Sequence, residues 1–336
     1  MRRPTTNPTD PVGRAVLVVT SLEDVTADLV IEELNSLGAR IVRVDPADIG
    51  PELTFGATLG PGGWTGSLTT PSRAAAFEEI GAVYYRRPNP WQMPQLHGAD
   101  NRTRVFAAAE AKHGLGGLLT NIPGCRYVNH PAAAARAEFK TAQLQTAVRI
   151  GLPVPPTLIT NDVGRARAFA EEHGPVVYKP FRGLPVSDDG QAGAIWAQRI
   201  DPQTLDESIA WTAHLFQAEV PMTADARITV VGREVFAQQI CAPDGALDWR
   251  RGDWDALEHQ PLTVPPAVAE MLFTYLDAFG LVFGCFDFVL REDLPQDAPE
   301  RFTFIECNPG GQWGWLPDST DIAMAFARLL TEGPRP

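Results

Sequence analysis

Three polar residues near the C-terminus have the types and spacing of a magnesium site. Glu306 and Asn308 lie in FIECNPGG, where the preceding apolar residues predict a strand, so both side chains leave the same face. Asp287 lies inside the apolar run FGCFDFVL, a second predicted strand, where an acid needs a partner or a metal. Carboxylate and amide oxygens are hard ligands suited to Mg²⁺. We therefore expect Asp287, Glu306 and Asn308 to converge on one metal site.

Two antiparallel strands must position this site. The segment between Asp287 and Glu306 includes the acidic, polar stretch 291–301, which has a suitable length for a loop between neighbouring strands. The sequence Pro309-Gly310-Gly311 should end the second strand and let the backbone approach another group. The competing interpretation is a strand-end acid held by a backbone amide, beside a turn asparagine.

The whole chain has the composition of an ordinary globular protein. Its 336 residues, 44% hydrophobic and 21% charged, predict two or three domains with sizeable cores. A net charge of −13 argues against nucleic-acid binding and against an anionic membrane surface. The four cysteines form no CxxC pair, which favours reduced thiols in a cytoplasmic protein. We find no signal peptide and no apolar run of transmembrane length.

The first third of the chain predicts a parallel α/β domain after a loose tail over residues 1–13. Strand, helix and strand within about 30 residues are typical of a βαβ unit, but the first turn has no glycine, which excludes a dinucleotide-binding loop. The predicted elements are a strand over 15–20, a helix over 26–37, a strand over 40–44, a hairpin over 54–70, a strand over 82–87, a helix over 102–119 and a strand over 126–128.

Two adjacent arginines, Arg86 and Arg87, end the predicted strand VYYRRP. On a strand they point to opposite faces, so at most one of them would serve a given site. They are either solvated at a sheet edge or in contact with an anion or carboxylate at the carboxyl end of a parallel sheet. The sequence favours neither interpretation.

Two lysines in the middle of the chain are candidates for phosphate contacts. Lys179 ends a predicted strand over 176–179, where a compact positive charge often faces a phosphate, and Lys140 lies within a long predicted helix over 132–150. Each could instead be an amphipathic surface lysine. The glycine-containing stretch 181–194 could close over phosphates through backbone amides, but it lacks the Lys-Ser/Thr ending of a Walker-type loop.

The remaining predicted elements surround these residues. Asp225 and Arg227 share one face of a strand, and Asp248, Trp249 and Arg250 lie in a loop rich in Gly and Trp. The other expected elements are a strand over 157–160, a helix over 163–173, a short strand ending at 217–221, strands over 228–231 and 235–240, and helices over 266–279 and 320–330.

In sequence order, Lys140, GLPVPPT, VVYKP, QAEV, DARITVVG, FDFVL and ECNPGG together resemble the ATP-grasp ligases. Within that superfamily, VYYRRP, the DWR of residues 248–250 and NPGGQWGW resemble the ribosomal peptide maturases that make graspetides, the microviridin-type synthetases. The resemblance covers residues 16 to about 330. It implies an α/β (α+β) ATP-grasp fold with an N-terminal parallel-sheet pre-ATP-grasp domain over 14–128, a central lobe over 129–216, and a C-terminal lobe with the magnesium-binding strands over 217–336.

The resemblance also implies ATP and Mg²⁺ as cofactors and a role for each matching residue. These roles are phosphate contacts by Lys140 and Lys179, adenine binding by the backbone of Gln217, Ala218, Glu219 and Val220, a place near phosphate and substrate for Asp225 and Arg227, oxyanion stabilisation by Arg227 or Arg250, Mg²⁺ ligation by Asp287, Glu306 and Asn308, and substrate binding by Arg86, Arg87 and Asp248. The stretch after Lys179 is less glycine-dense than in many ATP-grasp ligases.

The implied reaction activates Asp or Glu side chains of a ribosomal precursor peptide, leader plus core, as acyl phosphates and cyclises them with Ser/Thr or Lys side chains. Nucleic acid and membrane are not expected as partners, and association into a homo-oligomer is left open, as is the choice between ester and amide rings. One alternative is a ligase that adds a free amino acid to a peptide or protein. The other is a non-catalytic peptide- or nucleotide-binding protein on the same fold.

Overall fold

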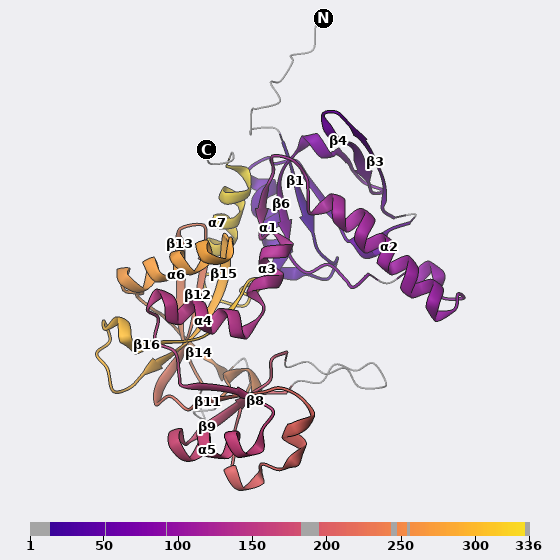
Figure 1. The fold of residues 1–336 in the computed structure, drawn as a ribbon. Coiled ribbons are helices and arrows are strands. Elements are labelled where there is room, and N and C mark those ends of the chain that lie inside the picture. Colours follow the sequence, from indigo (N-terminus) through magenta and orange to yellow (C-terminus); the bar gives the residue numbers. More distant parts are fainter. Residues whose placement is uncertain are drawn as a thin grey trace, which may run out of the picture.

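The structure is a computed structural model that describes residues 14–50, 52–91, 93–182, 195–242, 247–253 and 256–332. These residues form four sheets, and Figure 1 shows an N-terminal domain above a C-terminal lobe, with a smaller central lobe below. The predicted tail over 1–13 lies outside the described residues. No helix in the described ranges combines the length and the apolarity needed to cross a membrane.

The N-terminal domain is built on a parallel sheet, as the βαβ pattern predicts. Its strands have the order β2-β1-β6-β7, and all three pairings are parallel. The strands are β1 (Ala15–Val19), β2 (Ile41–Val44), β6 (Ile80–Tyr85) and β7 (Arg126–Val128). Helix α1 (Val25–Ser36) joins the first two strands. Asp24 is its N-cap residue, and the Asp24 side chain accepts a hydrogen bond from the Ala27 backbone.

Both faces of this sheet are covered, and the two covers come from distant parts of the chain. Alternate residues of β1 point to opposite faces, with Val16 and Val18 on one side and Leu17 and Val19 on the other. The first face packs against α1 and the C-terminal helix α7 (Ser319–Thr331), which were not predicted to meet. The second face packs against α2 and the hairpin sheet, whose elements are α2 (Asn101–Leu119), β3 (Thr54–Gly60), β4 (Gly63–Thr69) and β5 (Ala74–Ala76).

The central lobe is a small antiparallel sheet with the order β10-β9-β11-β8. Helix α5 (Val163–His173) packs on it through Ala166 and Ala170. Its strands are β8 (Thr157–Thr160), β9 (Val176–Lys179), β10 (Gln198–Arg199) and β11 (His214–Ala218). The stretch suggested to close over phosphates, 181–194, lies outside the described residues from position 183 onward.

The C-terminal lobe is a five-stranded antiparallel sheet with the order β14-β13-β12-β15-β16. One face buries an aromatic core under α6 (Pro266–Phe279), whose Tyr275 contacts the rings of Phe286 and Phe304. The strands are β12 (Met222–Val231), β13 (Glu234–Cys241), β14 (Glu258–Pro261), β15 (Phe283–Arg291) and β16 (Phe302–Asn308). Short 3₁₀ turns cover Pro46–Asp48, Phe77–Glu79, Pro94–Leu96, Pro202–Thr204, Glu207–Trp211, Trp249–Arg251 and Pro299–Arg301.

The single long helix predicted over 132–150 is wrong. Two helices stand there, α3 (Pro131–Ala137) and α4 (Lys140–Ile150), with Phe139 in an extended conformation between them. Gln143 makes the break possible, because its side chain donates to the carbonyls of Ala137 and Cys307 and accepts from the Cys307 backbone. The break makes Lys140 the first residue of α4 rather than an interior one.

The turn after β16 is packed against the neighbouring strand, as its two glycines suggested. A Cβ on Gly311 would lie 2.5 Å from the Cys285 Cβ and 2.6 Å from its sulfur, whereas one on Gly310 would meet nothing within 4 Å. Of these two glycines, Gly311 is the one at which the close approach requires a residue without a side chain.

Gly311→Ala should therefore destabilise the protein by about 1–3 kcal/mol, because the added methyl overpacks the contact with β15. Urea unfolding followed by tryptophan fluorescence measures the change. Gly310→Ala is the matched control and should change stability far less. Equal stabilities for the two variants would contradict the packing described here.

Candidate active site

Asp287 and Glu306 face each other across neighbouring strands. They are register partners of β15 and β16, which pair antiparallel as predicted. The amide nitrogen of Asn308 lies 3.3 Å from Asp287 Oδ2 and 3.4 Å from Glu306 Oε1. The structure thus brings together all three side chains that the sequence proposed as metal ligands.

Arg227 reaches Asp287 from the strand on the other side. The two residues are register partners of β12 and β15, and Arg227 Nη1 donates to Asp287 Oδ1 at 2.6 Å. Burial raises the pKa of Asp287, and Arg227 opposes that rise. Burial also acts to lower the pKa of Arg227, but Asp287 and other nearby groups raise it above its usual value. The guanidinium is therefore a permanent positive charge beneath the site.

Glu306 is held by cations from two other parts of the chain. Lys140, at the start of α4, donates to Glu306 Oε2, and Arg250 Nη1 lies 3.5 Å from Oε1. Burial alone would raise the pKa of Glu306, but Lys140, Arg250 and Lys179 lower it well below its usual range. The carboxylate is therefore ionised at any ordinary pH.

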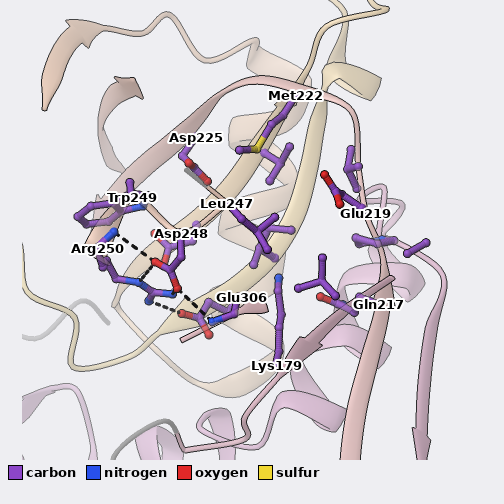
Figure 2. A pocket seen from close by; sticks show the side chains of 18 residues that line it. Lys179, Gln217, Glu219, Met222, Asp225, Leu247, Asp248, Trp249, Arg250 and Glu306 are labelled. Carbon is purple, nitrogen blue, oxygen red and sulfur yellow. Dashed lines mark hydrogen bonds and ion pairs between the residues drawn. The ribbon is translucent and has the colours of Figure 1, made fainter. Parts of the chain in front are cut away.

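The loop with Asp248 and Arg250 is fixed from three sides. Arg250 Nε and Nη2 donate to the two carboxylate oxygens of Asp248 at 2.8 and 3.1 Å, as Figure 2 shows. Asp248 also accepts from the Ala197 backbone, 3.5 Å away in the central lobe. The rings of Trp249 and Trp315 pack with their centroids 5.1 Å apart. The predicted substrate and catalytic residues of this loop therefore stand at the boundary between the two lobes.

A pocket lies between the central and C-terminal lobes and is lined by the predicted nucleotide-binding residues except Lys140, which lines an adjoining cavity. Figure 2 shows Lys179, Gln217 and Glu219 on one side and Asp225, Asp248 and Arg250 on the other. All four predicted hinge residues, Gln217, Ala218, Glu219 and Val220, line it. The backbone N–H groups of Ala218 and Glu219 already donate to Pro156 and Pro175, which leaves the Val220 N–H as a candidate adenine donor in this hinge.

Lys179 and Asp225 both line this pocket, and the pKa of each is shifted from its usual value. Desolvation lowers the pKa of Lys179 to about 8. Desolvation, with Asp287 and Asp248 nearby, raises the pKa of Asp225 to about 7. Both values lie close to neutral pH, which is typical of functional sites.

A second cavity adjoins the first, and basic residues outnumber acidic ones in its lining. It shares Lys179, Arg250 and Glu306 with the first pocket. The basic residues in its lining are Arg86, Arg87, Lys140, Lys179, Arg182 and Arg250. An anionic group bound there would lie next to whatever occupies the first pocket.

Arg86 and Arg87 do not lie on a strand, so the expectation that at most one of them serves a given site loses its basis. Strand β6 ends at Tyr85, so the alternation of a strand does not apply to them. Arg86 donates to the Gly311 carbonyl and Arg87 to the Gly310 carbonyl, so both arginines hold the same turn. A direct substrate contact by either one stays a prediction.

Two residues of this region could not be singled out from the sequence. Gln312 lies inside the motif NPGGQWGW without a predicted role, and Asp24 lies outside the motifs named above. Both contact Arg86. Their distance from Arg86 in the sequence hid that contact.

The residues present fit a magnesium ion. No group of three or more His, Cys, Asp and Glu side chains able to hold a metal occurs in the ranges that the structure describes. Asn308 is the side chain placed to complete a metal site between Asp287 and Glu306, and a half-turn of its amide would present its oxygen to the ion. Two carboxylates and an amide oxygen form a hard donor set, as Mg²⁺ requires.

Asp225→Asn should stabilise the metal-free protein at pH 8 but not near pH 4. The pKa of Asp225 is about 7 in the folded protein, above its ordinary value of 3.8. The contribution of Asp225 to wild-type stability therefore falls as the pH rises from 3.8 to about 7, and it stays constant at higher pH. The amide cannot ionise and escapes this loss. Urea unfolding at both pH values gives the comparison.

The control is Asp28→Asn, which removes a carboxylate paired with Arg43, and it should show no gain in stability at pH 8. No difference between Asp225→Asn and wild type at pH 8 would contradict the assignment.

Comparisons with known proteins agree with this geometry. The family described as the MvdD pre-ATP grasp domain matches residues 15–134. The glutathione synthetases of Bordetella parapertussis and Bordetella bronchiseptica are each 29% identical over 168 residues. These residues are 48% of this chain and 45% of the synthetases, so the chain matches less than half of their length.

Solved structures match over nearly the whole chain. A RiPP-associated ATP-grasp ligase of Chryseobacterium gregarium, in complex with ADP and a leader and core peptide, has a TM-score of 0.87 and 26% identity, covering 96% of this chain and 98% of that one. The macrocyclase MdnB of Microcystis aeruginosa has a TM-score of 0.75 and 27% identity, covering 95% and 99%. The chain therefore resembles ATP-grasp ligases in fold over nearly its whole length, and its residues 15–134 match an MvdD-type pre-ATP-grasp domain.

Proposed function

We propose that the protein is an ATP-dependent ligase that cyclises a ribosomal precursor peptide. It activates Asp or Glu side chains of the peptide and joins them to Ser or Thr hydroxyls or to Lys amines of the same peptide. The observation that carries this proposal is the pair of adjoining cavities, because they share Lys179, Arg250 and Glu306. A nucleotide in one cavity and a peptide carboxylate in the other would meet at these residues.

The neighbouring protein from Chryseobacterium gregarium supports this choice of substrates. Its structure holds ADP together with a leader and core peptide. The basic lining of the second cavity suits an acidic side chain of a core peptide. The whole chain has a net charge of −13, which repels anions. The basic lining is therefore a local feature that attracts an anion to this cavity.

The residues of the site match the needs of the reaction. A carboxylate is a poor electrophile, and transfer of the γ-phosphoryl group from ATP makes an acyl phosphate and leaves ADP. A peptide hydroxyl or amine then attacks the acyl carbon, loses its proton, and expels phosphate. Mg²⁺ at Asp287, Glu306 and Asn308 would supply charge neutralisation on the phosphates. Lys140 and Lys179 would hold the phosphoryl oxygens in place as compact positive charges.

Arg227 and Arg250 are the candidates for stabilising the developing oxyanion, a contribution of a few kcal/mol in such sites. Arg250 lines both cavities, whereas Arg227 is buried beneath Asp287. Arg250 is therefore better placed for direct contact with the reacting carbonyl. Asp248 would orient it through their paired hydrogen bonds.

The alternative is a ligase that joins a free amino acid to a peptide or protein. The sequence similarity to glutathione synthetases is the observation in its favour. It would use the same nucleotide pocket and differ only in the acceptor. The mass change of the peptide product separates the two.

Asn308→Ala should raise the Mg²⁺ concentration needed for half-maximal ADP binding by about tenfold or more, since it removes one of three ligands. Calorimetric titrations with ADP at a series of Mg²⁺ concentrations give the shift. Asn308 carries no charge, so its loss leaves no buried ion unpaired. An unchanged Mg²⁺ dependence would exclude Asn308 as a ligand.

Incubation of the protein with ATP, Mg²⁺ and a candidate precursor peptide, ideally one encoded beside this gene, tests the reaction. We expect the peptide to lose one water for each bond formed while ADP appears, as mass spectrometry and chromatography show. A mass gain equal to an amino-acid residue would instead establish the alternative ligase. ATP bound without any turnover, across several acidic peptides, would contradict both.

A further inference from the structure

A buried ion pair in the N-terminal domain lies between α1 and β6. Asp24 Oδ2 accepts from Arg86 Nε at 2.7 Å, and the side chains of Asp24 and Arg86 are 3% and 1% exposed. The same oxygen accepts from the Thr20 hydroxyl at 2.8 Å, and Oδ1 accepts from the Ala27 backbone. Ala27 and Thr20 therefore hold the Asp24 carboxylate in place, and its Oδ2 contacts the Arg86 guanidinium.

The other nitrogens of Arg86 cross into the C-terminal lobe. Nη1 donates to the Gly311 carbonyl at 3.2 Å, and Nη2 donates to the side-chain oxygen of Gln312 at 2.5 Å. The Thr26 hydroxyl, on α1, donates to the same Gln312 oxygen at 2.8 Å. Two donors of the N-terminal domain thus hold the side chain of one residue in the turn after β16.

The backbone of Gln312 continues the connection toward the metal strands. Its carbonyl accepts from Arg227 Nη2 at 2.9 Å, while Nη1 of the same guanidinium holds Asp287. A planar guanidinium with both terminal nitrogens engaged has one orientation. The position of the Gln312 carbonyl therefore decides where Arg227 places the Asp287 carboxylate.

Stability alone is a weak reason for this arrangement. Removing an Asp and an Arg from water costs several kcal/mol, and an apolar pair of similar volume is often as stable. Buried ionic groups do, however, specify one geometry where a looser contact would allow several. A metal ligand needs such a fixed geometry, because a shift of its carboxylate weakens the ion's coordination.

We infer that Asp24 is a positioning residue for the metal site, acting on Asp287 through Arg86, Gln312 and Arg227. The inference rests on the proposed function, since it takes Mg²⁺ and nucleotide as the ligands. It gives the N-terminal domain a role in nucleotide binding without any contact to the nucleotide. We call the four residues Asp24, Arg86, Gln312 and Arg227 the relay.

Asp24→Asn tests the relay, with Asp28→Asn as the matched control. Asp28 lies on the same helix and pairs with Arg43 at 2.6 Å, outside the relay. Calorimetric ADP binding at a series of Mg²⁺ concentrations is the readout. Asp24→Asn should raise the Mg²⁺ concentration for half-maximal binding by about tenfold, the lower end for a residue that orients a metal ligand. Asp28→Asn should leave it unchanged.

A second pair of variants covers the case in which Asp24→Asn does not fold. Gln312→Leu removes the side-chain oxygen that accepts hydrogen bonds from Arg86 and Thr26. Gln312→Glu keeps a side-chain oxygen that can accept both bonds. Binding should weaken at limiting Mg²⁺ in the first variant and be largely restored in the second. A purely structural role would lower the melting temperature in Gln312→Leu and leave the Mg²⁺ dependence of the folded protein unchanged.

The outcomes separate this inference from the proposed function. If wild type binds ADP with Mg²⁺ and folded Asp24→Asn and Gln312→Leu share its Mg²⁺ dependence, the relay is wrong and the ligase proposal stands. If wild type binds no ADP at any Mg²⁺ concentration, the proposed function fails and the relay fails with it. A shift in both variants with none in Asp28→Asn supports the relay, even if the peptide chemistry proves different.

Discussion

Two carboxylates on adjacent strands set the main constraint on this structure. The register of β15 and β16 places Asp287 opposite Glu306, and like charges in that position repel. Without a metal, nearby cations must offset this repulsion. Arg227 does so for Asp287, and Lys140 and Arg250 do so for Glu306. The positions of three distant parts of the chain follow from these pairings.

These pairings also explain why the site lies where the parts of the molecule meet. Lys140 begins a helix that packs against the C-terminal sheet, while Lys179 ends a strand of the central lobe. Arg250 lies in a loop whose Asp248 touches the central lobe. A divalent ion would take over part of the neutralisation and leave the lysines available to phosphates. The cations that balance the metal-free site are thus the ones the proposed chemistry needs.

The sequence predicted most of the fold and the convergence of Asp287, Glu306 and Asn308, because these residues lie in short local patterns. Apolar runs predicted the strands that contain Asp287 and Glu306. The number of residues between the two acids indicated that these strands pair and bring the acids close together. The break before Lys140 could not be predicted, since Gln143, whose side chain bridges it to Ala137, is held by Cys307, which is far away in the sequence. The shared turn of the two arginines was missed for the same reason. Long-range contacts override a local pattern without leaving a local signal.

The packing of α7 against α1 has a consequence for the order in which this chain can fold. Ser319–Thr331 completes the core of a domain that begins at β1, with Phe326 against Tyr84. During synthesis the ribosome releases β1, α1 and β6 long before α7 exists. The apolar face that α7 covers must remain open until then, or be protected by a chaperone. This domain precedes the two lobes in the chain and is nevertheless finished only after them.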